Sequence, residues 1–264
     1  MKTKLKLHPI TLGLTVGLMT HMTASAATVF SDDFATNPFA SRWTYDQSEA
    51  SYPLYWTGAG SPPSGGLPAN ANNNSVYSGA YGSYQSMSSV DTTVPVGVTG
   101  WTELTYSLNF QMGGTVINNY IGVLANRSGT NGYMAGIYTG GSGHIAFVDA
   151  YGLAWTTPNV NVAANTWYTF KTTLTKSGTD ISMQSQILDL SNTVLGTSPI
   201  ATFANATYQN PNGFYIKFGH DPADYWSQAT QIDNFSVTAV PEPSSAALLG
   251  GLGALSLIRR RRTR

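Results

Sequence analysis

A strict alternation of apolar and polar residues between positions 104 and 112 constrains the fold of this chain more than any other feature. The apolar members are Leu104, Tyr106, Leu108, Phe110 and Met112, and the polar members are Thr105, Ser107, Asn109 and Gln111. A period of two puts all the apolar side chains on one side of an extended strand. The pattern therefore predicts a long β-strand with one face in a hydrophobic core.

Comparable patterns recur along the chain and extend the prediction to a whole sheet domain. Further strands are expected at residues 120–125, 133–138, 145–148, 168–174, 181–187, 214–218 and 231–238. Turn-forming Asn and Gly residues separate them, and Ser177-Gly178-Thr179-Asp180 has the composition of a hairpin turn. In the segment 214–218, the spacing predicts Ile216 inward and Tyr215 and Lys217 outward.

Composition agrees with an all-β domain. All six Trp, all fifteen Tyr and all ten Phe lie between residues 27 and 239, where the helix-favouring residues Lys and Glu are scarce. A segment of about 213 residues suits one sandwich or barrel, and the absence of cysteine excludes a disulfide framework. We predict a single antiparallel β-sandwich over residues 27–239, with short helical segments only in the two terminal targeting sequences.

The formal charge of zero hides an acidic domain. Residues 27–239 hold five Lys and Arg against twelve Asp and Glu, which gives a net charge of −7. Five scattered cations offer no basic patch for a phosphate backbone. We therefore expect no nucleic-acid partner.

The first 26 residues have the layout of a secretory signal peptide. Lys2, Lys4 and Lys6 precede the apolar residues 10–19, and Ala24-Ser25-Ala26 supplies a small-residue cleavage pattern. The mature chain is expected to begin near Ala27, so the domain is an exported one.

The last 25 residues, 240–264, have the layout of a sorting tail. Val240-Pro241-Glu242-Pro243 precedes the apolar residues 246–258 and the arginines 259–262. The apolar run is shorter than the roughly 20 residues that a spanning helix needs. The tail resembles the PEP-CTERM sorting signal of Gram-negative, polysaccharide-producing bacteria. That resemblance implies processing by an exosortase-type protease, at least transient membrane insertion, and delivery to the cell envelope or extracellular matrix.

Three short motifs suggest a fold family for the domain. They are Ser31-Asp32-Asp33-Phe34 near its start, Asn165-Thr166-Trp167-Tyr168 before a central strand, and residues 231–237 at its end. Together they resemble the concanavalin A-like lectin/glucanase and laminin G-like proteins. The resemblance implies an antiparallel jelly-roll β-sandwich, a fold that hosts lectins, glycan-binding modules, glycosidases and lyases, so activity depends on the site.

The same resemblance implies a structural calcium ion that joins the first and last strands. Asp32, Asp33 and Asp233 occupy the corresponding positions, and carboxylates are preferred calcium ligands. An alternative remains open in which Asp32 and Asp33 cap a turn and Asp233 forms a local hydrogen bond.

Candidate sugar-binding residues lie in polar, loop-like stretches, above all in residues 48–89. Flat aromatic rings can contact the C–H faces of a pyranose, and neighbouring amides and carboxylates can bond its hydroxyls. The candidate ligand-binding residues are Tyr52, Tyr55, Trp56, Trp155, Tyr225 and Trp226. By contrast, Trp43, Trp101 and Trp167 stand beside strand starts and are expected to pack in the core or at an edge.

Catalytic patterns are weak. Only Glu49 and Glu103 are available as glutamates in the domain, and neither has a carboxylate two or four residues away, as the paired acids of a glucanase strand require. Tyr215-Ile216-Lys217-Phe218-Gly219, with His220 and Tyr225, resembles a strand of alginate-lyase-like proteins, but the arginines of its companion strand are missing at residues 101–105. We assign no catalytic residue.

The sequence thus favours an exported carbohydrate- or matrix-binding module that associates with exopolysaccharide. Two alternatives remain: a jelly-roll polysaccharide lyase or glycoside hydrolase that acts on exopolysaccharide, and a structural biofilm-matrix protein without a defined ligand.

Overall fold

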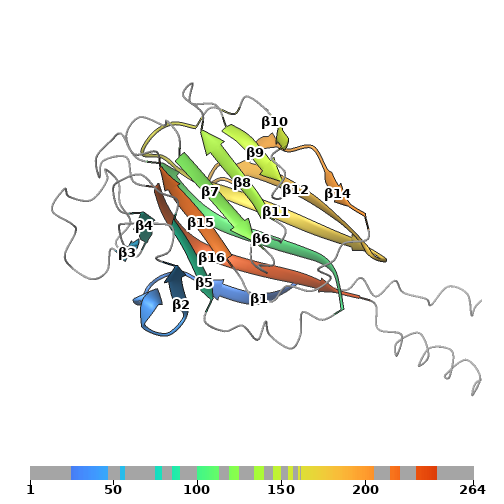
Figure 1. Ribbon diagram of the computed structural model, residues 1–264, viewed down its shortest axis with the longest axis horizontal. Coiled ribbons are helices and arrows are strands. Elements are labelled where there is room, and N and C mark those ends of the chain that lie inside the picture. The colour runs from blue at the N-terminus through green and yellow to red at the C-terminus, as the bar shows by residue number, and fades with distance from the viewer. Residues whose placement is uncertain are drawn as a thin grey trace, which may run out of the picture.

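Two antiparallel β-sheets pack face to face in this protein (Figure 1). The computed structural model describes residues 25–46, 54–56, 75–78, 85–89, 100–112, 119–124, 134–139, 145–149, 154–156, 160, 162–204, 215–220 and 230–242. The jelly-roll sandwich predicted from the sequence is confirmed, and every strand pairing among these residues is antiparallel.

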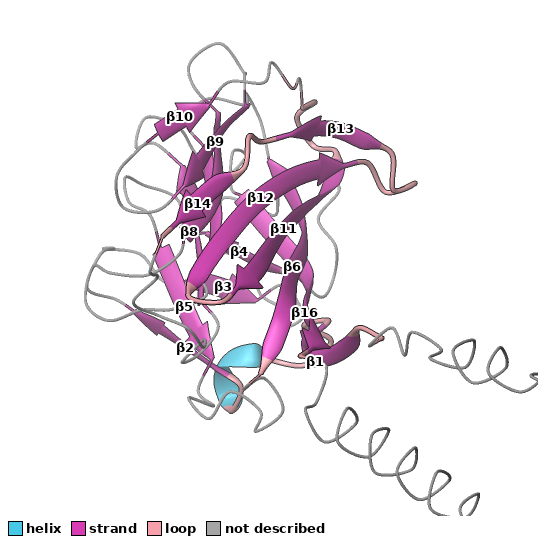
Figure 2. Ribbon diagram, turned by 90° about the vertical axis from the view of Figure 1, so that its right-hand side faces the viewer, coloured by secondary structure: helices cyan, strands magenta, loops and turns pink. Residues whose placement is uncertain are grey.

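The first sheet has nine strands in the order β13-β12-β11-β6-β16-β4-β3, with β1 also paired to β16 and β14 also paired to β12. Figure 2 shows β12, β11, β6 and β16 side by side in this order. Its strands are β1 (Ala27–Asp32), β3 (Leu54–Trp56), β4 (Val76–Ser78), β6 (Trp101–Met112), β11 (Trp167–Ser177), β12 (Asp180–Leu188), β13 (Val194–Thr197), β14 (Ala201–Phe203) and β16 (Thr230–Pro241).

The second sheet has seven strands in the order β10-β9-β8-β7-β15-β5-β2. It packs over the first so that β8 lies against β12, and β15 lies against β16 and β4. Its strands are β2 (Trp43–Asp46), β5 (Gln85–Ser89), β7 (Asn119–Leu124), β8 (Met134–Thr139), β9 (Ile145–Asp149), β10 (Ala154–Thr156) and β15 (Tyr215–His220).

All of the strands predicted from alternation are present, and the structure adds short elements that alternation did not indicate. Residues 48–89, expected as one long polar loop, contain β3, β4 and β5. Helix was predicted only in the terminal segments, yet one 3₁₀ turn, η1 (Pro38–Ala40), precedes β2. This turn forms because proline stands at its first position and the Asn37 side chain accepts a hydrogen bond from the Phe39 N–H at 3.0 Å.

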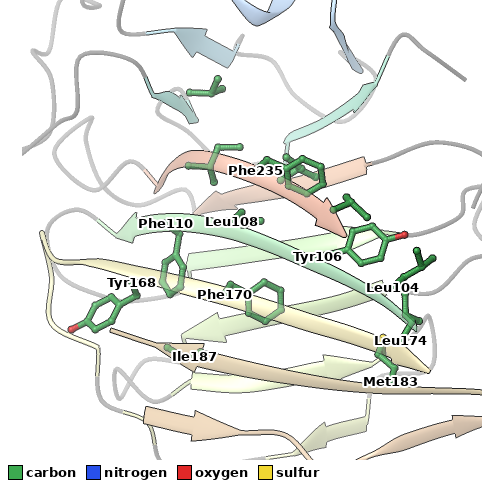
Figure 3. Packing of buried hydrophobic residues seen from close by; sticks show 14 of the residues in the cluster. Leu104, Tyr106, Leu108, Phe110, Tyr168, Phe170, Leu174, Met183, Ile187 and Phe235 are labelled. Carbon is green, nitrogen blue, oxygen red and sulfur yellow. The ribbon is translucent and has the colours of Figure 1, made fainter. Parts of the chain in front are cut away.

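The alternating apolar residues of β6, β11 and β12 form one buried layer on the inner face of the nine-stranded sheet (Figure 3). Phe110 of β6 lies beside Tyr168 of β11, with ring centroids 5.8 Å apart. Tyr106 is also buried here, and burial raises the pKa of its phenol, so the group stays neutral. Trp43 and Trp101 are core residues, as the sequence predicted, whereas Trp167 is half-buried.

A β-bulge in β16 keeps the last strand in phase with the core. Ile232 is buried before the bulge, whereas Phe235 and Val237 are buried after it, so the inward positions change from even to odd. The register against β6 shifts between Asp233 and Ser236, and Asn234 there adopts φ 50°. Asparagine tolerates this left-handed conformation better than most residues do. The extra residue lets both halves of β16 bury apolar side chains.

Two hydroxyl groups are bonded to each other inside this core. Thr172 of β11 and Ser185 of β12 are direct register partners, both are buried, and their hydroxyl oxygens lie 2.9 Å apart. Because the two hydroxyl groups are hydrogen-bonded to each other, neither is buried without a partner, which would cost desolvation energy.

We predict that Ser185→Ala or Thr172→Val alone lowers the free energy of unfolding by about 1–3 kcal/mol, because each leaves the other hydroxyl unsatisfied. The double variant should lose clearly less than the sum of the two. Urea denaturation of all four proteins gives the coupling energy, and strictly additive losses would contradict the paired arrangement.

Candidate functional site

Buried and exposed side chains of β2 and β15 show which residues lie on the outer face of the seven-stranded sheet. Ile216 is buried and is in register, through Met87, with Tyr45 of β2. Trp43, two residues from Tyr45 and so on the same face, is also buried, whereas Thr44 between them is exposed. Neighbouring residues of a strand alternate between faces, and direct cross-strand partners share a face. Every residue in register with Thr44, or two positions along from such a residue, therefore belongs to the outer face.

One register row crosses all seven strands on this outer face. Following the pairings from β2 to β10, its members are Asp46, Ser86, Lys217, Gly122, Gly136, Val148 and Trp155. We call this set the central row. It brings one acidic, one basic and one aromatic residue to the same face, with two glycines between them.

Three tyrosines lie in the register rows beside the central row. Tyr120 and Tyr138 are direct partners, two positions along from Gly122 and Gly136. Tyr215 stands two positions from Lys217 on the other side. With Trp155, four aromatic residues share this face, and we call these four residues the aromatic face. Figure 1 looks onto the sheet that carries it, and no other described element lies in front of that sheet.

The structure separates the aromatic residues that the sequence singled out. Trp155 lies in β10 and belongs to the aromatic face, whereas Tyr55 and Trp56 lie in β3 of the other sheet. β10 and β3 are edge strands at opposite flanks of the sandwich (Figure 1). Tyr52, Tyr225 and Trp226 lie outside the described residues. The three described candidates therefore do not share one surface.

Sequence reasoning missed Tyr120 and Tyr138, although a signal for both is present. Tyr120-Ile121-Gly122 and Gly136-Ile137-Tyr138 are mirror images, as neighbouring antiparallel strands require for like residues to meet. The predicted outward placement of Tyr215 and Lys217 agrees with the buried position of Ile216 between them.

The second candidate site is the junction of the first and last strands. Asp32, at the end of β1, is a register partner of Phe235 in β16 and is only 4% exposed. Its Oδ1 accepts a hydrogen bond from the Phe34 N–H at 2.9 Å, and its Oδ2 accepts one from the Trp43 indole N–H at 2.7 Å. Arg42 adds a cation, with its Nη1 3.4 Å from Oδ1.

Backbone strain at Phe34 accompanies this arrangement. Phe34 adopts φ 50°, which is unusual for a bulky residue, and its ring is completely buried beside Trp43. Burial of the ring and the hydrogen bond to Asp32 offset the cost of that conformation. Asp32 therefore anchors the turn between β1 and β2.

These contacts do not fit a calcium ion held by the three predicted aspartates. Asp33 is exposed and its Oδ1 accepts from the Ala35 N–H at 3.1 Å, while Asp233 Oδ1 accepts from the Asn234 N–H at 2.7 Å. Within the described segments, no three His, Cys, Asp or Glu side chains gather in a possible metal site. The contacts match the alternative, in which these aspartates cap turns and bond locally.

An open depression of about 570 Å³ lies over this junction. Its lining residues are Ser31, Asp32, Asp33, Arg42, Asn234, Phe235 and Ser236. The exposed rim is polar, and Asp33 and Arg42 contribute opposite charges to it.

The described residues also bear on the enzymatic alternatives. Glu103 pairs in register with Thr175 and Val240, so no carboxylate stands beside it on the neighbouring strands. His220 ends β15 at a position in phase with buried Ile216, on the face opposite Tyr215 and Lys217. His220 and Tyr215 thus do not share a face in this register.

Comparison with known proteins indicates where the cell delivers this chain. Residues 239–262 match the PEP-CTERM protein-sorting motif. The chain is therefore an exported protein that is sorted to the cell envelope.

No curated protein matches it in sequence. Among the described residues no helix is long and apolar enough to cross a membrane, and the apolar residues 246–258 of the motif lie outside them.

Solved structures support the lectin-like jelly roll. Peanut lectin superposes with a TM-score of 0.50 at 12% identity, and the match covers 84% of this chain and 100% of the lectin. A GH43 glycoside hydrolase superposes with a TM-score of 0.53 at 11% identity, covering 81% of this chain and 41% of the hydrolase. At these identities the likeness is one of fold alone.

The PEP-CTERM motif begins inside the folded domain. β16 continues two residues beyond the predicted boundary at 239, and Pro241 is a register partner of Trp101. The Glu242 N–H donates to the Gly100 carbonyl, and the Glu242 carboxylate lies 3.1 Å from Lys176 Nζ. Lys176 also stands over the Trp101 ring at 5.8 Å. The first residues of the motif thus cover a buried tryptophan.

We predict that a chain ending at Ala239 melts roughly 2–5 °C below one ending at Glu242, because it loses these pairings and uncovers Trp101. Calorimetry of the two chains measures the difference. Equal melting temperatures would show that residues 240–242 are not part of the folded domain.

Proposed function

We propose that this protein is a carbohydrate-binding module that holds polysaccharide at the envelope of a Gram-negative bacterium. The aromatic face is the observation that carries the proposal. Tyr120, Tyr138, Tyr215 and Trp155 share the outer face of one sheet, with Lys217 on the same strand as Tyr215 and Asp46 at the far end of the central row, on β2. Aromatic rings beside a few polar groups are the usual surface on which proteins bind sugars.

The central row suits an extended chain of sugars. Gly122 and Gly136 have no side chain, so a ligand that crosses the middle of the row can approach the backbone closely. Aromatic residues stand on both sides of these glycines, and Trp155 stands at the end of the row. A linear polysaccharide that runs along the row would meet Trp155 in the row itself and would pass Tyr120 and Tyr138 in the neighbouring row.

Charge favours a neutral polysaccharide over an acidic one. The domain between residues 27 and 239 carries a net charge of −7, and Lys217 is the single cation of the central row. A polyanion would be repelled by the rest of the surface. Exopolysaccharide of the producing cell is the ligand that fits both this chemistry and the delivery to the envelope.

The sorting tail provides the attachment in this proposal. An exosortase-type protease would process the tail, which would enter the membrane at least transiently. β1 and β16 lie side by side, with Ala27 in register with Ala239, so the mature N-terminus lies next to the start of the tail. The domain would then be held through β16 of the nine-stranded sheet, while the aromatic face belongs to the other sheet.

We predict that Trp155→Ala weakens binding to a neutral polysaccharide about tenfold, because one stacking surface of about 1.4 kcal/mol is lost. The polysaccharide for this test is one that the mature chain binds on a glycan array. The matched control is Trp167→Ala, since Trp167 is a half-buried residue of the nine-stranded sheet, in register with Gln111. Titration calorimetry of the three proteins should show a loss for the Trp155 variant only.

Two results would contradict the proposal. One is unchanged binding by the Trp155 variant together with loss in the Trp167 variant, which would assign the ligand to the other sheet. The other is a glycan array on which the mature chain binds no neutral glycan.

A further inference from the structure

Arg42 contacts the oxygen atoms that a metal ion would take at the junction of the first and last strands. Its Nη2 donates a hydrogen bond to the Ser31 carbonyl, and its Nη1 lies 3.4 Å from Asp32 Oδ1. A backbone carbonyl and a carboxylate are also the usual ligands of calcium. The Arg42 guanidinium lies 5.6 Å from the centre of the Phe30 ring, so a third contact fixes its place.

We propose that Arg42 is a built-in cation that replaces a metal ion at this junction. The guanidinium neutralises the buried Asp32 carboxylate, and the domain requires no divalent ion there. The Arg42 side chain is 43% exposed, while that of Asp32 is 3% exposed, so the cation closes the site from its solvent side.

The other contacts of Asp32 leave little room for a metal. Its two oxygens already accept from the Phe34 N–H and the Trp43 indole N–H. A calcium ion near this carboxylate would compete with these donors for the two oxygens and would stand beside a guanidinium, which repels it. Because Arg42 directly precedes Trp43, one short segment supplies both the charge and the indole donor. The Arg42 guanidinium therefore belongs to the same stretch of chain as the turn that it stabilises.

A guanidinium differs from calcium in one functional respect. Arginine stays protonated at all pH values that a protein encounters, and it cannot dissociate. The junction should therefore keep its charge balance whatever the calcium concentration around the exported domain.

Thermal unfolding of the wild-type chain tests this directly. The melting temperature should agree within about 1 °C in excess EDTA and in millimolar calcium chloride, because a ligand raises it only by binding the folded state. A rise of several degrees with calcium would overturn the proposal.

Arg42→Gln tests whether the charge of Arg42 matters. This variant keeps a polar side chain but leaves the carboxylate of Asp32 without a counter-charge, and should melt roughly 4–8 °C lower than wild type. The matched control is Lys176→Gln, which removes the cation of a pair whose carboxylate, on Glu242, is 48% exposed, and should cost at most about 2 °C. A loss in Arg42→Gln no greater than in the control would contradict the built-in cation.

Arg42→Lys keeps the test decisive if Arg42→Gln does not fold. Lysine retains the charge but cannot contact both oxygens with a planar fork. It should yield a folded chain that melts between the wild type and Arg42→Gln. A Lys variant as damaged as the Gln variant would show that shape, and not charge, is what the junction needs.

Discussion

The sandwich depends on the pairing of its last strand. β16 pairs with β6 along one side and with β1 and β4 along the other, so it joins the first strand of the domain to the centre of the nine-stranded sheet. Because side chains alternate along a strand, a slip of one residue would move the whole apolar set of β16 to the outside. The bulge at Asn234 prevents this conflict by shifting the phase once, between Ile232 and Phe235.

Register has the same importance on the opposite sheet. The pairings between β2 and β10 decide that Trp155 falls in one row with Lys217 and Asp46, and that Tyr120 falls beside Tyr138. The proposed function rests on this register and not on long loops. A rigid sheet can hold aromatic residues at fixed spacing, which a loop achieves only at an entropic cost.

The sequence allowed the fold to be predicted wherever a long periodic pattern was present. The alternation at 104–112 corresponds to β6, and the stretches at 168–174 and 181–187 correspond to β11 and β12. Three-residue strands such as β3 and β10 are too short to show a period, so their aromatic residues were interpreted as belonging to loops. The separation of Trp56 from Trp155 depends on sheet order, which no local pattern encodes.

The junction of β1 and β16 shows a similar limit. Asp32, Asp33 and Asp233 suggested a metal site, since a sequence gives residue types and not the donors that face them. The indole of Trp43 and the guanidinium of Arg42 reach Asp32 only because the η1 turn brings them back to the end of β1. The competing interpretation, in which these aspartates cap turns, was also available from the sequence, and the local contacts of Asp32, Asp33 and Asp233 agree with it.

Hydroxyl-radical footprinting of the free chain, read by mass spectrometry, tests the central claim most directly. The register of the seven-stranded sheet predicts that Tyr120, Tyr138, Tyr215 and Trp155 are oxidised readily, while the buried Trp43 and Trp101 are protected. Protection of the four residues to the level of Trp43 would contradict the aromatic face.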